Sequence, residues 1–177
     1  MDPLLNKGII LLKGDVNGAM VGHLYQSLAV LEGQGSPDIE IRIFSGGGSV
    51  AAGLDIYDAI RRYAGKKIGV VYAYARSMGA IVLQACDERV CLPHARVLIH
   101  HINRQSVSLD DLDDAERLEV LRTEMWENQN AIYAILIHRT NKTKKEISEA
   151  CKKDRDMTAQ EALSFGLIDR IDEKEGG

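Results

Sequence analysis

Ser77 is the residue whose type and setting most clearly allow chemistry, within Ala-Arg-Ser-Met-Gly-Ala at residues 75–80. It lies between a predicted strand and a predicted short apolar helix, and the small residues around it let the backbone turn sharply. A serine at a helix start lies beside backbone N–H groups that lack partners in the helix, and such groups can hold an oxyanion. The local sequence alone favours a helix-capping serine, because this segment is not the Gly-x-Ser-x-Gly nucleophile elbow.

A run of three glycines, residues 46–48 between Ser45 and Ser49, follows another predicted strand. Glycines permit close approach of other groups and leave backbone N–H groups exposed. No Gly-Lys-Ser/Thr follows the run, so a nucleotide phosphate-binding loop is not expected. Three interpretations remain: an oxyanion hole, an edge that docks a peptide, and a tight strand-to-helix turn.

His100 and His101 end an apolar run that is predicted to be a strand. Adjacent residues on a strand point to opposite faces, so only one of them can face a given site, and a metal site built from both is not expected. A lone histidine at a strand end is most often structural. The other histidines have no better context and are expected at the surface or in packing: His23, His94 and His138.

Asp154 lies in a charged run, Lys-Lys-Asp-Arg-Asp at residues 152–156. A carboxylate there can orient a histidine as the third member of a catalytic triad. The simpler interpretation is a solvated loop, because charges of alternating sign are common on surfaces. Each of these four features is weak when taken alone.

The elements that must position these residues alternate between strand and helix through the first 100 residues, which predicts an α/β fold with mostly parallel strands. A helix over 109–139 begins with acidic residues and ends with His-Arg, as the helix dipole favours, and at roughly 45 Å it is long enough to protrude and pack against another subunit. The predicted strands are 8–13, 39–44, 68–72, 88–92, 96–100 and 167–171, with a tight turn at 45–48. The other predicted helices are 16–32, 49–64, 77–85, 142–152 and 159–165, and residues 172–177 are predicted to be a loose tail.

Composition sets limits on the class of protein. The 177 residues suit one domain, and the net charge of -4 argues against a general nucleic-acid binder. The apolar run near the N-terminus is too short to span a membrane. Three cysteines without a CxxC pair are expected to be reduced, buried thiols of a cytoplasmic protein: Cys86, Cys91 and Cys151.

Taken together, these features resemble the ClpP family of self-compartmentalising serine peptidases, from about Gly8 to Ile171. The resemblance implies a single domain over 1–177 that folds as a spiral of β-α-β units, as in the crotonase superfamily, with a protruding helical handle. The head would comprise about 8–100 and 154–172, and the handle about 101–153. The segments that carry the resemblance are 44–53, 56–58, 75–80, 92–100, 154–159, 161–162 and 166–169.

The resemblance also implies a role for individual residues. The family's nucleophile falls on Ser77, its base falls on His100, and its acid falls on Asp154. No metal and no organic cofactor would be needed. The implied oxyanion donors are the backbone N–H groups of Met78 and Gly48, with Gly47 beside them.

The activity implied by the resemblance is that of a serine endopeptidase that cleaves unfolded polypeptides inside a homo-oligomeric chamber, a heptameric ring or a double ring. Few residues precede Gly8, whereas family members that dock an unfoldase ATPase carry a longer segment, so this partner is left open. Two alternatives are kept. One is a non-catalytic ClpP-like ring subunit or scaffold, and the other is a crotonase-type acyl-CoA enzyme.

Several residues depart from the family pattern without touching the three implied catalytic residues. Gly46 replaces a proline, and Tyr74 and Arg76 stand where small or amide residues are common before the nucleophile. Asp156 stands where an aromatic residue is usual, and His101 replaces a glutamine. Arg76 is therefore expected to alter the electrostatics or the subsite shape near Ser77.

Overall fold

A computed structural model describes residues 3–104 and 106–173. Within these residues a seven-stranded sheet runs in the order β1-β2-β3-β4-β7, and β5 pairs with β3 and with β6. Every pairing is parallel except that of β5 with β6. The strands are β1 Ile9–Val16, β2 Ile39–Gly48, β3 Lys67–Arg76, β4 Glu88–Cys91, β5 Arg96–Leu98, β6 Met157–Thr158 and β7 Arg170–Ile171.

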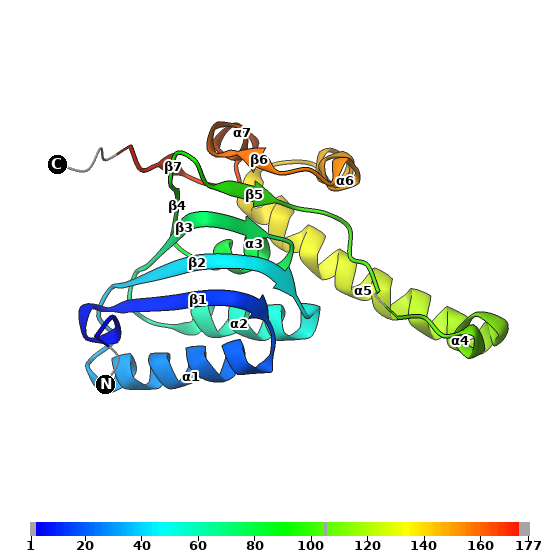
Figure 1. The fold of residues 1–177 in the computed structure, drawn as a ribbon, viewed down its shortest axis with the longest axis horizontal. Coiled ribbons are helices and arrows are strands. Elements are labelled where there is room, and N and C mark those ends of the chain that lie inside the picture. Colours follow the sequence, from blue (N-terminus) through cyan, green and yellow to red (C-terminus); the bar gives the residue numbers. More distant parts are fainter. Residues whose placement is uncertain (1–2, 105, 174–177) are drawn as a thin grey trace.

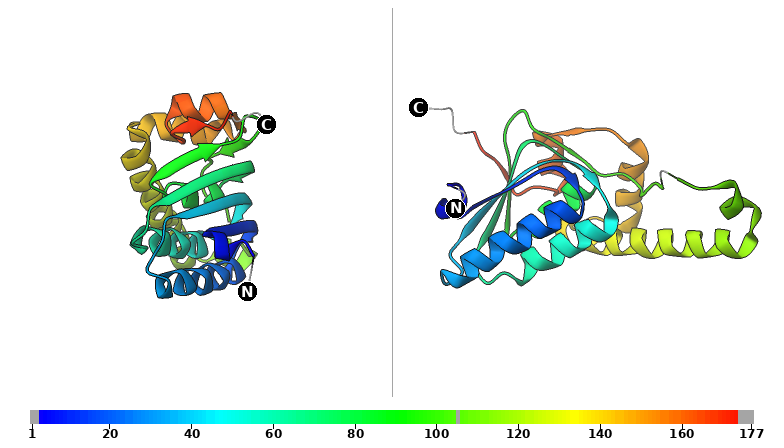
Figure 2. Two further views of the ribbon diagram at one scale, coloured as in Figure 1. Left: turned by 90° about the vertical axis from the view of Figure 1, so that its left-hand side faces the viewer. Right: turned by 60° about the horizontal axis from the view of Figure 1, so that its bottom comes forward.

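Helices α1 Gly18–Gly33, α2 Val50–Arg62 and α3 Met78–Leu83 connect the parallel strands and pack on one face of the sheet (Figures 1 and 2). A short 3-10 helix, Leu5–Lys7, precedes β1. Alternate side chains of β2 are buried beneath these helices, as expected for a strand with one covered face. The predicted alternation of strand and helix and the mostly parallel sheet are confirmed, although β4, β5 and β7 are shorter than predicted.

The predicted tight turn at 45–48 is wrong, because β2 continues through Gly48. In this stretch Gly47 pairs with Asp15 and Gly48 pairs with Val16 after a shift of register. A side chain at Gly48 would place a Cβ 2.4 Å from the Val16 carbonyl oxygen, so only glycine allows this close approach. The glycine run is thus part of the sheet, and Ser49 caps α2 directly after it, as predicted.

Strand β3 is also longer than predicted and runs to Arg76, which brings Ser77 to the carboxyl end of a central strand. Helix α3 follows at once, so one residue separates a strand from a helix. Ligand and catalytic residues gather at such carboxyl ends in parallel sheets.

The predicted helix over 109–139 is divided into α4 Leu109–Asp113 and α5 Ala115–Thr140. Asp114 has extended backbone angles, and its side chain accepts hydrogen bonds from the N–H groups of Glu116 and Arg117, so it caps α5. The 26 residues of α5 span about 39 Å, and its N-terminal half extends well beyond the sheet, with α4 at the far end (Figure 1). The protruding helix is therefore confirmed.

The chain returns from this arm through α6 Lys144–Lys153 and α7 Ala159–Phe165. Thr143 and Thr158 each begin their helix with a capping box, in which the helix-start glutamate bonds back to the threonine. Head and handle boundaries at about 100 and 154 stay predictions. Of the predicted loose tail, residues 174–177 lie outside the described residues.

The three cysteines are free and buried. Burial raises the pKa of Cys86 to about 12 and that of Cys91 and Cys151 to about 11. Because the thiolate is the reactive form, we expect native protein at pH 8 to leave Ellman's reagent unreacted. In guanidinium chloride all three thiols should react. Rapid reaction of one equivalent in the native protein would contradict this expectation.

Candidate active site

Three neighbouring strands bring the predicted catalytic residues together at one edge of the sheet. Ser77 follows β3, His100 lies just beyond β5, and Asp154 lies between α6 and β6. Strand β5 pairs with β3 on one side and with β6 on the other. The Ser77 N–H donates to the Leu98 carbonyl oxygen at 2.9 Å, which fixes the end of β3 against the end of β5.

The backbone of Ser77 has φ 51 and ψ -125, a conformation that residues with a side chain rarely adopt. This sharp turn lets β3 end and α3 begin within one residue. The Ser77 side chain accepts no hydrogen bond from α3, so it does not serve as the capping serine that the local sequence favours. Its hydroxyl is left available at the start of the helix.

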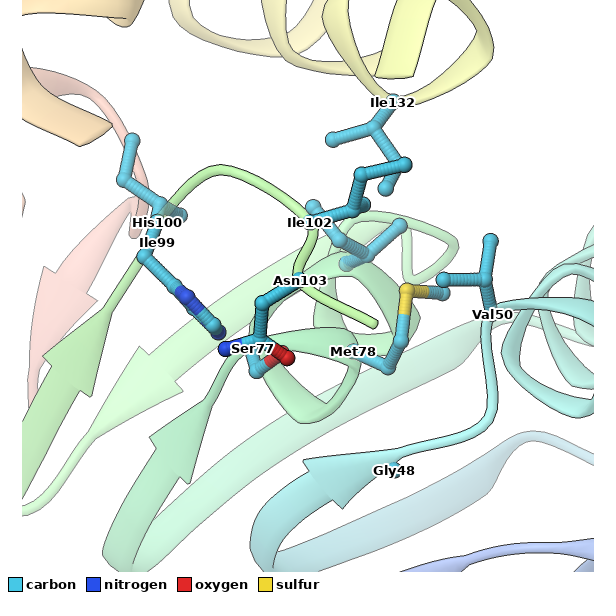
Figure 3. A pocket seen from close by; sticks show the side chains of 10 residues that line it. Gly48, Val50, Ser77, Met78, Ile99, His100, Ile102, Asn103 and Ile132 are labelled. Atoms are coloured by element: carbon cyan, nitrogen blue, oxygen red, sulfur yellow. The ribbon is translucent and has the colours of Figure 1, made fainter. Parts of the chain in front are cut away.

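Ser77 and His100 line the same pocket, and the imidazole of His100 points toward Ser77 (Figure 3). The Asn103 side chain, from the segment that follows His100, also extends toward Ser77, and Gly48 lies opposite. The remainder of the pocket wall is apolar and comes from α2, α3, α5 and the segment after β5. These apolar residues are Val50, Met78, Ile81, Ile99, Ile102 and Ile132.

Asp154 lies near the Nδ1 atom of His100. Its Oδ1 is 4.0 Å from Nδ1 of His100, which is longer than a hydrogen bond. The Asp154 side chain is 68% exposed and that of His100 is 19% exposed. Within the described ranges no hydrogen bond joins Ser77 Oγ to His100. The three residues are thus brought together, although the contact between the Asp154 carboxylate and the His100 imidazole is longer than in a closed triad.

The predicted oxyanion donors surround Ser77. Met78 is the first residue of α3, so its N–H has no acceptor within the helix. The Gly47 N–H instead donates to Ser45 Oγ at 3.1 Å. Gly48 lines the pocket itself. Met78 and Gly48 thus line the same pocket as Ser77, and Gly47 lies close to Ser77 with its N–H directed to Ser45.

Gly47 also approaches Ser77 so closely that it leaves no room for a side chain. A Cβ at this position would lie 2.5 Å from Ser77 Cβ, so Gly47→Ala should displace Ser77 and lower kcat/KM by about 100-fold. Gly46→Ala is the matched control, because a Cβ there meets nothing within 4 Å. Peptide hydrolysis by the two variants compares them. Equal rates would show that the approach of Gly47 to Ser77 is unimportant.

His101 faces away from this pocket. Its Nε2 is 2.8 Å from the Tyr133 hydroxyl on α5 and 3.4 Å from Ser148 Oγ on α6. The expectation that only one of the two adjacent histidines can face the site is confirmed. The remaining histidines are exposed, as predicted: His23, His94 and His138.

Sequence reasoning did not foresee an ion pair beside Ser77. The Arg76 guanidinium donates to both carboxylate oxygens of Asp156, at 2.7 and 2.6 Å, and lies over the Tyr74 ring. The hydrogen bonds from Arg76 lower the pKa of Asp156. The sequence held one indication of this ion pair: Arg76 and Asp156 both depart from the family pattern, and they carry opposite charges. Asn103 was also missed, since nothing in its sequence context marks it.

Residues 3–104 and 106–173 contain no group of three or more His, Cys, Asp or Glu side chains that could hold a metal ion. None of the helices formed by the described residues is long and apolar enough to cross a membrane.

The central parallel sheet, the helices on its face and the projecting arm define an α/β protein of the ClpP fold, so the predicted fold class is confirmed. A family model described as Clp protease matches residues 1–175 of the 177 residues. The chain therefore belongs to the Clp protease family, a family of peptidases.

Proposed function

We propose that this protein is a serine endopeptidase in which Ser77 is the nucleophile, His100 the base and Asp154 the acid. The observation that carries the proposal is the Ser77 hydroxyl, held on a strained turn and free of capping, in one pocket with His100. Asp154 lies behind His100 on the Nδ1 side, where a carboxylate orients a histidine.

The chemistry then follows from the arrangement. His100 takes the Ser77 proton as Oγ bonds to a peptide carbonyl carbon, and the N–H groups of Met78 and Gly48 stabilise the oxyanion. When the intermediate collapses, the C–N bond breaks and His100 gives its proton to the leaving amine. Water, deprotonated by His100, then attacks the acyl-enzyme and the Ser77 Oγ–C bond breaks, which releases the acid and restores the hydroxyl.

The surroundings support a substrate and an assembly. The apolar wall beside Ser77 favours an apolar side chain next to the cleaved bond. The arm exposes large apolar side chains, which supports packing against further copies of this chain. We propose that these copies form a ring or double ring in the cytoplasm and act on unfolded polypeptides. An unfoldase ATPase as partner stays open. The large apolar side chains that the arm exposes are Leu109, Leu112, Leu118, Val120 and Trp126.

A fluorophosphonate probe, which reacts with activated serines, tests the proposal. We expect the wild-type protein to be labelled and Ser77→Ala to remain unlabelled, with loss of peptide cleavage. Ser164→Ala, at an exposed serine on α7, is a control for serines elsewhere. Labelling that persists in Ser77→Ala would overturn the assignment. A wild-type protein that is neither labelled nor cleaves peptides would favour the non-catalytic ring subunit, and binding of acyl-CoA esters would favour the crotonase-type enzyme.

A further inference from the structure

The Arg76–Asp156 ion pair connects the segment that carries Ser77 to the segment that carries Asp154. Arg76 is the last residue of β3, immediately before Ser77, and Asp156 follows Asp154 by two positions. Strand β5 lies between β3 and β6, and Arg76 itself pairs with Leu98 of β5. The Arg76 side chain therefore reaches across β5 to the segment that carries the acid. Two short hydrogen bonds to one carboxylate fix both distance and orientation.

The segment that carries the acid is short and has few other side-chain attachments. Residues 154–156 form the whole connection between α6 and β6. Asp154 ends α6 in the left-handed conformation, where its N–H bonds to the Cys151 carbonyl oxygen at 3.3 Å, and its side chain is largely exposed. Asp156 is the point at which this connection is held from the side by another strand.

A small change in this connection has a large effect on the acid. The 4.0 Å between Asp154 Oδ1 and His100 Nδ1 is about 1 Å longer than a hydrogen bond. A movement of that size toward His100 forms the bond, and the same movement away leaves the imidazole without an orienting partner. The anchor at Asp156 therefore limits how far Asp154 can move from His100.

We propose that Arg76 and Asp156 are positioning residues, which hold the segment 154–156 so that Asp154 stays within reach of His100. This inference rests on the proposed function. Arg76 acts through other residues, because it is absent from the residues that line the pocket around Ser77. Its guanidinium is occupied by Asp156 on one edge and by the Tyr74 ring at 4.6 Å on its face.

A mutant cycle that includes Asp154 tests the proposal. Arg76→Met and Asp156→Ala are each made in the wild-type protein and in Asp154→Ala, and kcat and KM are measured with a fluorogenic peptide. In the wild-type background each variant should lower kcat by about 10-fold or more with little change in KM, since a misplaced group near the reacting atoms costs rate. In the Asp154→Ala background the same changes should alter kcat less than about twofold, because they act through Asp154.

Matched variants separate positioning from a general loss of structure. Arg170→Met breaks the exposed pair of Arg170 with Glu88, which lies outside this segment, and should leave kcat unchanged. The reciprocal variant Arg76→Asp/Asp156→Arg should recover part of the lost rate. The melting temperature of each variant is measured to detect loss of structure. If Arg76→Met fails to fold, Asp156→Ala removes the same ion pair and takes its place in the comparison.

The outcomes are distinct. Equal losses in both backgrounds, or a change in KM alone, would show that the pair acts on folding or on substrate, and this would overturn the proposal. Unchanged kcat in the wild-type background would overturn it as well. A wild-type protein that the fluorophosphonate does not label would instead refute the proposed function, and the positioning role with it.

Discussion

His100→Ala is expected to lower kcat/KM by about 10⁵- to 10⁶-fold, whereas Asp154→Ala should lower it by only about 10³- to 10⁴-fold. The difference has a structural reason. His100 faces Ser77 within the pocket and is the residue proposed to accept its proton. Asp154 is largely exposed and 4.0 Å away, so water can replace part of its effect on the imidazole. Steady-state hydrolysis of one peptide by each purified variant measures both values.

His101→Ala is the matched control for the histidine variant. His101 contacts Tyr133 and Ser148 on the arm, so its loss should change kcat/KM by less than about tenfold. If His101→Ala and His100→Ala lose activity equally, the assignment of the base to His100 is wrong. If Asp154→Ala is as inactive as His100→Ala, Asp154 has a larger role than its exposure indicates.

Arg89→Met should lower the free energy of unfolding by about 3 kcal/mol, because it leaves several buried partners unpaired. The Arg89 side chain is 6% exposed and binds the Asp169 carboxylate. It also donates to Gln84 Oε1 and to the carbonyl oxygens of Arg139 and Gly166. These contacts join the end of α5 to the sheet, so their loss should loosen the base of the arm. Urea unfolding followed by circular dichroism gives the free energy.

The control for Arg89 is Arg170→Met, which breaks the exposed pair with Glu88 and should cost less than about 1 kcal/mol. A pH series adds a second check. Burial raises the pKa of Asp169, but the hydrogen bonds from Arg89 outweigh it and lower this pKa below 3.8. The carboxylate's contribution is therefore present above pH 3.8 and lost as the pH falls below the folded pKa. The difference in free energy of unfolding between wild type and Arg89→Met should therefore become smaller in acid. A difference that does not change with pH would exclude Asp169 as the main partner of Arg89.

The alternation of strands and helices was predictable because apolar periodicity and helix caps are local properties of the chain. The continuation of β2 through the glycine run was not. Gly47 and Gly48 pair with residues of β1, more than 30 positions earlier, and this pairing outweighs the local preference of glycine for turns. The break at Asp114 was also missed. In a long run of acidic residues, the sequence does not show which aspartate turns its carboxylate back to cap the helix.

Ser77, His100 and Asp154 were assigned from the family resemblance, because the local patterns favoured simpler roles for each of them. The structure adds the reason why they can meet, which is that β3, β5 and β6 lie side by side. The pair of Arg76 with Asp156 joins residues 80 positions apart. Which of many surface charges meet at that separation is decided by the fold, so sequence alone could mark both residues as unusual but could not connect them.

The place of β6 in the chain has a consequence for biosynthesis. Asp154 and Asp156 precede β6, and the whole arm is synthesised before either residue emerges from the ribosome. A nascent chain that has already formed β1 to β5 carries Ser77 and His100 but not the segment that is proposed to orient the histidine. The proposed peptidase activity would therefore arise late in synthesis, after the arm that is proposed to bind other copies. A chain that ends before residue 154 should cleave peptides poorly.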